Sequence, residues 1–137
     1  MRTKSYQDFE VNLKIKLAFL WASLTFCYLY CDYFELYVPH KAAGLVSGTN
    51  LLDSPVKLLM ASALLTIPCL MVCLSILLRP SVNRWLNIIF GIFFTGFLLI
   101  IAVTSVTPWR YFYVFFALIE SIISSLIVYY AWNWSEN

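Results

Sequence analysis

Four long apolar stretches, separated by short polar connections, dominate the pattern of this chain. They cover residues 17–38, 57–78, 84–106 and 109–134. A helix needs about 20 mostly apolar residues, rising about 1.5 Å each, to cross roughly 30 Å of hydrocarbon, and each stretch is long enough. Prolines stand in the connections, where helices begin or end, at Pro39, Pro55, Pro80 and Pro108. The pattern predicts an all-α fold, an antiparallel bundle of four helices within a membrane.

The composition changes this picture little. Of the 137 residues, 62% are hydrophobic and 12% are charged, against about 45–50% and about 25% in soluble domains. A soluble core of this length cannot hide so much apolar surface, so the expected partner is the lipid bilayer. A net charge of +2 and a single histidine, His40, give no reason to expect nucleic acid or a metal site. Motifs of hydrolases and nucleotide-binding enzymes are absent, so we expect no enzymatic activity and no cofactor.

Basic residues are distributed unequally between the two ends of the predicted bundle. One end carries Arg2, Lys4, Lys14, Lys16, Arg79 and Arg84, and the other carries Lys41, Lys57 and Arg110. Because cytoplasmic loops are enriched in Lys and Arg, we expect both termini in the cytoplasm and the chain in the cell (inner) membrane. Residues 1–16 would then be a cytoplasmic juxtamembrane segment, 17–134 the membrane domain and 135–137 a cytoplasmic tail.

Two connecting segments and one internal proline show patterns of their own. Residues 9–16 alternate apolar and polar side chains, which is the period of a strand. Because a strand would have no partner there, an interfacial segment is the simpler interpretation. Residues 39–56 contain Gly44 and Gly48 and predict an irregular extracytoplasmic loop. Pro68 lies inside the second stretch, where it should kink the helix.

Glu120 lies deep inside the fourth apolar stretch. An ionised carboxylate at a helix centre costs about 2.5–3.5 kcal/mol on insertion scales, so it must be paired, hydrated or protonated. Tyr28, Thr95 and Glu120 each lie 11 residues from the start of their stretch, roughly 16 Å into the hydrocarbon. Thr66 lies near that level, so Tyr28, Thr66 and Thr95 are candidate hydrogen-bond partners of Glu120. The acid either exchanges a proton or ligand, or ties helices together as a neutral group.

Two further acids, Asp32 and Glu35, lie near the extracytoplasmic end of the first stretch. They could form a charged entrance to the bundle and pair with Arg110 or Lys57. The simpler interpretation is that they reach interfacial water. The cysteines form two pairs four residues apart, Cys27 with Cys31 and Cys69 with Cys73. A four-thiolate metal site or a quinone-linked redox pair is one interpretation. Helix packing by small side chains is the one we favour.

Five short motifs carry a resemblance to a known family. They are Tyr28–Asp32 (YLYCD), Ile67–Pro68 (IP), Asn83–Gly91 (NRWLNIIFG), Phe116–Glu120 (FALIE) and Trp132–Trp134 (WNW). From about residue 11 onward, the chain resembles a family of small bacterial four-helix integral membrane proteins catalogued as a domain of unknown function. On architecture alone it is more remotely similar to DoxX-type membrane proteins. The resemblance implies a fold and a location but no activity. It also implies that relatives carry an acid where this chain has Thr66.

The same resemblance draws attention to Asn83, Arg84 and Asn87 at the start of the third stretch. Their side chains could bind a ligand or a lipid headgroup at the cytoplasmic mouth of the bundle. The alternative, which we favour, is structural. In that interpretation Asn83 caps the helix, Asn87 forms an interhelical hydrogen bond, and Arg84 anchors the cytoplasmic side.

Three functional hypotheses follow from these residues. In the first, the chain binds or transports a small molecule, with Glu120 as the protonatable centre and Tyr28, Asp32, Thr66 and Thr95 around it. Four helices leave little room for a private pathway, which makes a homodimer a candidate assembly. In the second, the chain is a non-catalytic assembly subunit whose small-residue pairs Ala18/Ala22 and Ser121/Ser125 form packing seams. In the third, the cysteines make it a membrane redox protein.

Overall fold

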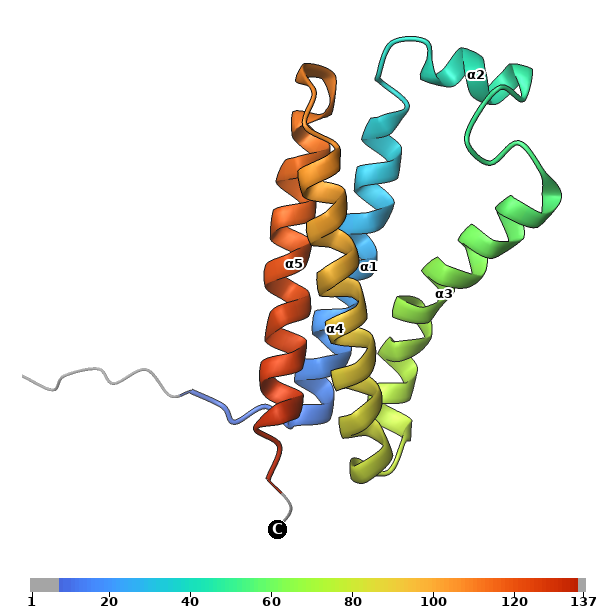
Figure 1. Ribbon diagram of the computed structural model, residues 1–137. Helices are drawn as coiled ribbons and strands as arrows, with labels where there is room; N and C mark the ends of the chain where they lie inside the picture. Colours follow the sequence, from blue (N-terminus) through green and yellow to red (C-terminus); the bar gives the residue numbers. More distant parts are fainter. Residues whose placement is uncertain (1–7, 136–137) are drawn as a thin grey trace, which may run out of the picture.

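The computed structural model describes residues 8–135, which form a bundle of long helices (Figure 1). The four long helices, α1 (Leu13–Glu35), α3 (Pro55–Leu77), α4 (Pro80–Thr104) and α5 (Tyr111–Trp132), run alternately up and down. The short helix α2 (Lys41–Ser47) lies beyond one end of the bundle, and a 3₁₀ turn, η1 (Pro108–Arg110), precedes α5. We call this the α2 end, and we call the opposite end, where residues 8 and 135 lie, the terminal end. The predicted all-α class is confirmed, with no strand among the described residues.

The helix boundaries differ from the predicted ones by a few residues, for local reasons. α1 begins at Leu13 rather than at 17, because the side chain of Asn12 accepts a hydrogen bond from the Lys14 backbone N–H at 2.9 Å and caps the helix. The alternating segment 9–16 is therefore not a strand, since its second half is the first turn of α1. Arg2, Lys4 and residues 136–137, which entered the predicted orientation and tail, lie outside the described residues.

Prolines set the other starts. Pro55 and Pro80 occupy the first turn of α3 and α4, where a missing N–H costs nothing, so α4 begins four residues before the predicted 84. The connection 39–56 is not wholly irregular, because it contains α2. His40 precedes α2 in a left-handed conformation (φ 65°), and Gly48 ends it in the same region (φ 76°).

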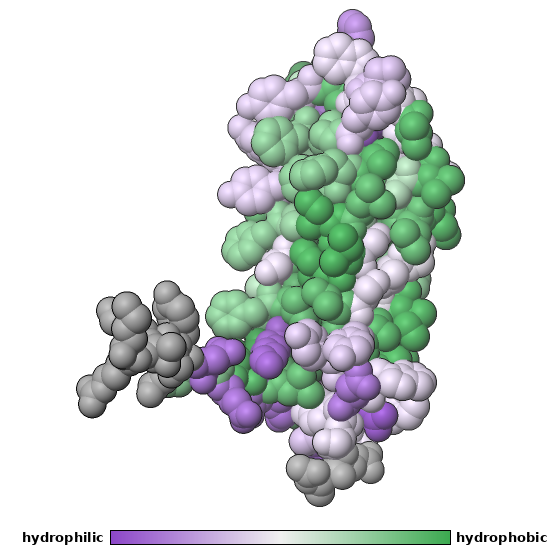
Figure 2. Space-filling model, turned by 90° about the vertical axis from the view of Figure 1, so that its left-hand side faces the viewer, coloured by the Kyte–Doolittle hydropathy of each residue, from purple (hydrophilic) through white to green (hydrophobic). Residues whose placement is uncertain are grey.

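The outer surface of the bundle is apolar, and this supports its place in a membrane. All four long helices have the length and hydropathy to cross a bilayer. Figure 2 shows a band of hydrophobic side chains across the middle of one face, with hydrophilic residues gathered at the terminal end. Phe19, Val103 and Ile122 are among the large apolar side chains that are mostly exposed. A soluble protein rarely exposes so continuous an apolar surface, whereas lipid chains match it.

The packed core fills mainly the terminal half of the bundle. Its buried members are Leu17, Trp21, Leu24, Met71, Phe94, Leu98 and Ile127. α1 packs between α3 and α5, and α4 packs along α5, whereas α3 meets α4 only sparsely. In Figure 1 the N-terminal half of α3 leans away from α1 and α4 toward the α2 end. Pro68 lies inside α3, and it cannot donate the helical hydrogen bond to the carbonyl of Leu64, which accounts for the bend.

Gly91 allows α4 to approach α5 closely. A Cβ added at Gly91 would lie 2.6 Å from Cγ2 of Val128 on α5. Gly96, further along the same helix, would have nothing within 4 Å of an added Cβ. The two glycines therefore differ only in what faces them, and they form a natural pair for testing the contact.

We expect Gly91→Ala to destabilise the bundle relative to Gly96→Ala. Val128 is β-branched and has few rotamers in a helix, so the added methyl group must push α4 and α5 apart, at a cost of about 1–3 kcal/mol. Both variants gain the same helix propensity, so their difference isolates packing. The measurement is the thermal unfolding midpoint in detergent micelles. A Gly91→Ala midpoint at or above that of Gly96→Ala would contradict the close approach.

Candidate functional site

A cavity of about 190 Å³ lies among all four long helices in the half of the bundle nearer the α2 end. Its polar lining comes from α1 and α5, which contribute Tyr28, Asp32, Tyr113 and Glu120, together with the thiol of Cys31. α3 and α4 contribute only apolar side chains. The leaning half of α3 creates this space, because the core that fills the terminal half does not continue between α3 and α4.

Glu120 lies inside this cavity and is buried, with 3% of its surface exposed. Its Oε1 atom has no hydrogen-bond partner among the described residues, and the hydroxyl of Tyr28, on the same cavity, has none either. A buried polar atom left without a partner costs about 1–3 kcal/mol. Such atoms in native proteins are normally satisfied by water, an ion or a ligand. Two such atoms on one cavity therefore mark it as a candidate binding site for a polar group.

Thr66 and Thr95, which we predicted beside Glu120, do not line the cavity. The exposed Thr66 hydroxyl donates to the Ser62 carbonyl at 2.7 Å. The Thr95 hydroxyl donates to the Gly91 carbonyl at 2.7 Å and lies 2.8 Å from the Ser124 hydroxyl, in the seam between α4 and α5. The expected hydrogen bonds from these threonines to Glu120 are therefore absent. Equal depth in the membrane did not fix the direction in which each side chain points around its helix.

The structure reveals one polar member of the cavity that we had not singled out. Tyr113 lies on α5, seven residues before Glu120, which is two helical turns and therefore the same face. Helical spacing predicts this shared face, although we did not name Tyr113 among the site residues. Asp32 is exposed, and it lies one turn beyond Tyr28 on α1. Tyr28, Asp32 and Glu120 are thus brought together on one cavity, with Tyr113 added.

The predicted cytoplasmic-mouth residues Asn83 and Asn87 form a closed network instead of a pocket. Both are fully buried. Trp21 Nε1 donates to Asn87 Oδ1 at 2.7 Å, Asn87 Nδ2 donates to Asn83 Oδ1 at 2.7 Å, and Asn83 Nδ2 donates to the Ser75 carbonyl at 2.6 Å. This network joins α1, α3 and α4. The cap predicted for Asn83 is wrong, because α4 begins at Pro80 and its N-cap position is Arg79.

Arg84 contacts the C-terminal end of α5. Its guanidinium donates to the carbonyls of Ala131 and Trp132, each at 3.3 Å. Because the last carbonyls of a helix lack intrahelical donors, Arg84 satisfies two of them and ties α4 to α5. At the terminal end, Asn83, Arg84 and Asn87 therefore form hydrogen bonds within the protein and hold the helices together.

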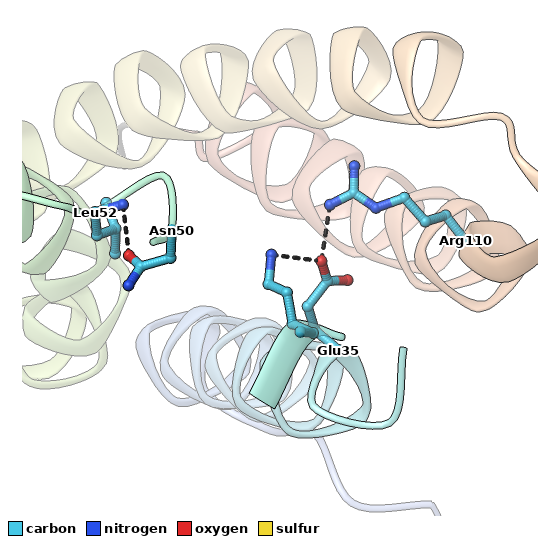
Figure 3. Close-up of polar contacts among 5 residues, drawn as sticks. Glu35, Asn50, Leu52 and Arg110 are labelled. Atoms are coloured by element: carbon cyan, nitrogen blue, oxygen red, sulfur yellow. Dashed lines mark hydrogen bonds and ion pairs between the residues drawn. The ribbon is translucent and has the colours of Figure 1, made fainter. Parts of the chain in front are cut away.

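At the α2 end, Glu35 is buried, with 9% of its surface exposed, and it does not reach interfacial water as the simpler interpretation expected. Its Oε1 accepts from Arg110 at 2.8 Å and pairs with Lys41 at 3.0 Å. Figure 3 shows Glu35 and Arg110 approaching each other from opposite sides. The predicted ion pair between Glu35 and Arg110 is present. Lys57, the other predicted partner, pairs with Asp53 at 2.6 Å instead. Lys41 was missed because it follows a turn and begins α2.

The cysteines do not build a metal centre. Cys31 is buried and Cys27 half-buried on α1, whereas Cys69 and Cys73 are exposed on α3. Within residues 8–135, no three His, Cys, Asp or Glu side chains are grouped closely enough to hold a metal ion. The two cysteine pairs therefore do not converge on one site, and the four-thiolate hypothesis finds no support in the geometry.

We expect Asn87→Leu to lower the thermal unfolding midpoint in micelles strongly. Leucine keeps the number and branching of the heavy atoms but leaves the Trp21 N–H and the Asn83 amide oxygen buried without partners, a loss of about 1–3 kcal/mol for each group. Asn133→Leu is the matched control, because Asn133 is exposed and donates only within its own helix end, to the Tyr129 carbonyl. Equal midpoints for the two variants would show that the network contributes nothing.

Comparison with known proteins gives the family of the chain but no activity. No curated protein and no solved structure matches. A match to the family of unknown function DUF6326 covers residues 4–137, which is almost the whole chain. That span includes all four long helices and every residue of the cavity. The chain therefore belongs to the family of unknown function DUF6326.

Proposed function

We propose that this protein binds a small molecule within the membrane, in the cavity around Glu120, and exchanges it against a proton on that acid. The observation that carries the proposal is the buried carboxyl with an unpartnered oxygen on a cavity of about 190 Å³. If Glu120 served only to tie helices together, its oxygen atoms would bond to a neighbouring helix, as the amide of Asn87 does. Intramembrane acids without such a structural partner mark ligand or proton sites in membrane proteins.

The two ends of the bundle support binding from the α2 side. At the terminal end, the buried core and the Asn83–Asn87 network fill the space between the helices. At the α2 end, the cavity reaches the exposed Asp32. The basic residues Lys14, Lys16, Arg79 and Arg84 lie at the terminal end, which favours a cytoplasmic terminal end and an extracytoplasmic α2 end. A ligand would then enter from the extracytoplasmic half. To release it on the cytoplasmic side, a transporter would have to open the Asn83–Asn87 network at the terminal end.

A single chain lines the cavity with its own four long helices, so the binding step needs no second copy. The small residues that suggested an assembly subunit are partly used within the bundle, since Ala18 on α1 and Ser121 on α5 are buried. The assembly hypothesis thereby loses two of the positions on which it rested, and ligand binding is the function we favour.

We expect the neutral probe para-fluorobenzyl alcohol to bind in this cavity. Its hydroxyl can reach the unpartnered polar atoms, and its ring suits the apolar lining. The cavity is somewhat larger than the engineered cavity of about 150 Å³ that holds benzene. The measurement is fluorine NMR of the probe with protein in lipid nanodiscs, compared with empty nanodiscs.

Two tryptophan variants make this prediction specific. Ala61→Trp places a large ring in the cavity and should weaken binding about tenfold or more. Ala63→Trp, on the exposed side of the same helix, should leave binding intact. If the probe shows no protein-dependent signal, or if the two variants behave alike, the cavity is not a binding site.

A further inference from the structure

We infer that the ligand of the Glu120 cavity is a small lipophilic amine, held by an ion pair between its ammonium group and the Glu120 carboxylate. This inference rests on the proposed function and names the chemical class of its ligand. It is argued from the charge of the cavity, the nature of its walls and its size.

The charged side chains on the cavity are acidic. Glu120 and Asp32 line it, and within residues 8–135 no Lys, Arg or His does. The lysine and arginine side chains nearest the α2 end are already engaged, because Arg110 and Lys41 pair with Glu35, and Lys57 pairs with Asp53. An anion or a zwitterion with a free carboxylate would therefore meet two acids and no available base. A cation would neutralise the buried carboxylate, and the low dielectric strengthens that attraction.

The walls require an apolar body behind the positive charge. Four aromatic rings line the cavity, from Tyr28, Phe94, Phe97 and Tyr113, and aromatic faces attract ammonium groups. Leu65 on α3 and Phe97 on α4 line the cavity and are also exposed, at 41% and 37%, so the cavity reaches the apolar surface where α3 and α4 separate. A polyhydroxylated ligand would lose its hydrogen bonds against these walls. An inorganic cation would lack the six or more oxygen ligands that such ions take.

The size of the cavity limits the ligand to about one ring or a short branched chain. Its volume of about 190 Å³ compares with about 150 Å³ for an engineered cavity that accepts benzene. A benzylamine-sized molecule fits this space. A sterol or a multi-ring dye does not fit without movement of α3.

The geometry also couples the amine to a proton. One carboxyl group can neutralise one positive charge, so a bound ammonium and a proton compete for Glu120. The titratable groups around Glu120 are Cys27, Tyr28, Cys31 and Asp32 on α1 and Tyr113 on α5. The parts of α3 and α4 that line the cavity carry apolar side chains only. Asp32, as the other acid, is the group whose titration must be distinguished from that of Glu120.

The test compares para-fluorobenzylamine with para-fluorobenzyl alcohol, which has the same shape without the charge. Binding is measured by fluorine NMR in nanodiscs of zwitterionic lipid, so that headgroups do not attract the amine. In the unmodified protein, we expect the amine to bind about tenfold or more tightly than the alcohol. This preference should fall as the pH is lowered through the range in which buried carboxyls titrate, because protonated Glu120 cannot form the ion pair.

Acid-to-amide variants assign the preference to one residue. Glu120→Gln should abolish both the amine preference and its pH dependence while the alcohol still binds. Asp53→Asn, which removes an exposed acid at the α2 end, should leave both unchanged. Loss of the preference in Asp32→Asn with its retention in Glu120→Gln would overturn the assignment. If Glu120→Gln does not fold, the pH dependence of the unmodified protein still decides, and a constant preference overturns the inference.

The outcomes separate this inference from the proposed function. If the alcohol binds and the amine binds no better, the ligand class is wrong but the cavity remains a binding site. If neither probe gives a protein-dependent signal, the proposed function fails as well.

Discussion

Hydrocarbon offers no hydrogen-bond partner, and this constraint organises the whole structure. Every polar side chain in the spans must either find a partner within the protein or reach an end of the bundle. Ser62, Thr66 and Thr104 bond to carbonyls of their own helices. A chain of hydrogen bonds runs from Trp21 on α1 through Asn87 and Asn83 on α4 to the Ser75 carbonyl on α3. Three buried side-chain atoms among the described residues have no partner. One is Oε2 of Glu35, whose Oε1 pairs with Arg110 and Lys41. The other two, Oε1 of Glu120 and the hydroxyl of Tyr28, lie on the same cavity.

The cavity and the sealed network are consequences of one division along the bundle. In the terminal half, large apolar side chains and the asparagine network bring the helices together. In the other half, α3 bends outward at a proline and no side chain replaces it against α4. The ion pairs of Glu35 then hold α1, α2 and η1 together above the opening. The packed core and the candidate site are thus located in different halves of the same four helices.

Hydrophobic patterning was sufficient to predict the four spans to within a few residues, because length and hydropathy are dictated by the bilayer. Hydrophobic patterning placed the start of α1 too late, at residue 17, because Lys14 and Lys16 interrupt the apolar pattern. The cap at Asn12 nevertheless starts the helix at Leu13. The patterning also missed α2, which is too short and too polar at its start to show a period. Tyr28 and Asp32 are four residues apart and therefore share one face of α1, and the structure brings that face to Glu120.

Equal depth did not place Thr66 and Thr95 beside Glu120, because the depth of a residue along a helix does not fix the direction of its side chain around the helix. The burial of Glu35 escaped prediction for a related reason. Its partner Lys41 follows a turn whose path depends on the left-handed conformation of His40, and Arg110 is distant in sequence.

The bend in α3 has a mechanical consequence. From Pro55 to Pro68 the helix forms an arm of about 20 Å, at about 1.5 Å per residue. Pro68 is the fulcrum of this arm, since it lacks the backbone bond that would stiffen the helix there. A rotation of about 10° at the fulcrum would carry the tip of the arm through roughly 3 Å. Such a rotation would widen or narrow the cavity beside Glu120 while the terminal half of the bundle kept its packing. One proline would then confine the conformational change to one half of the bundle.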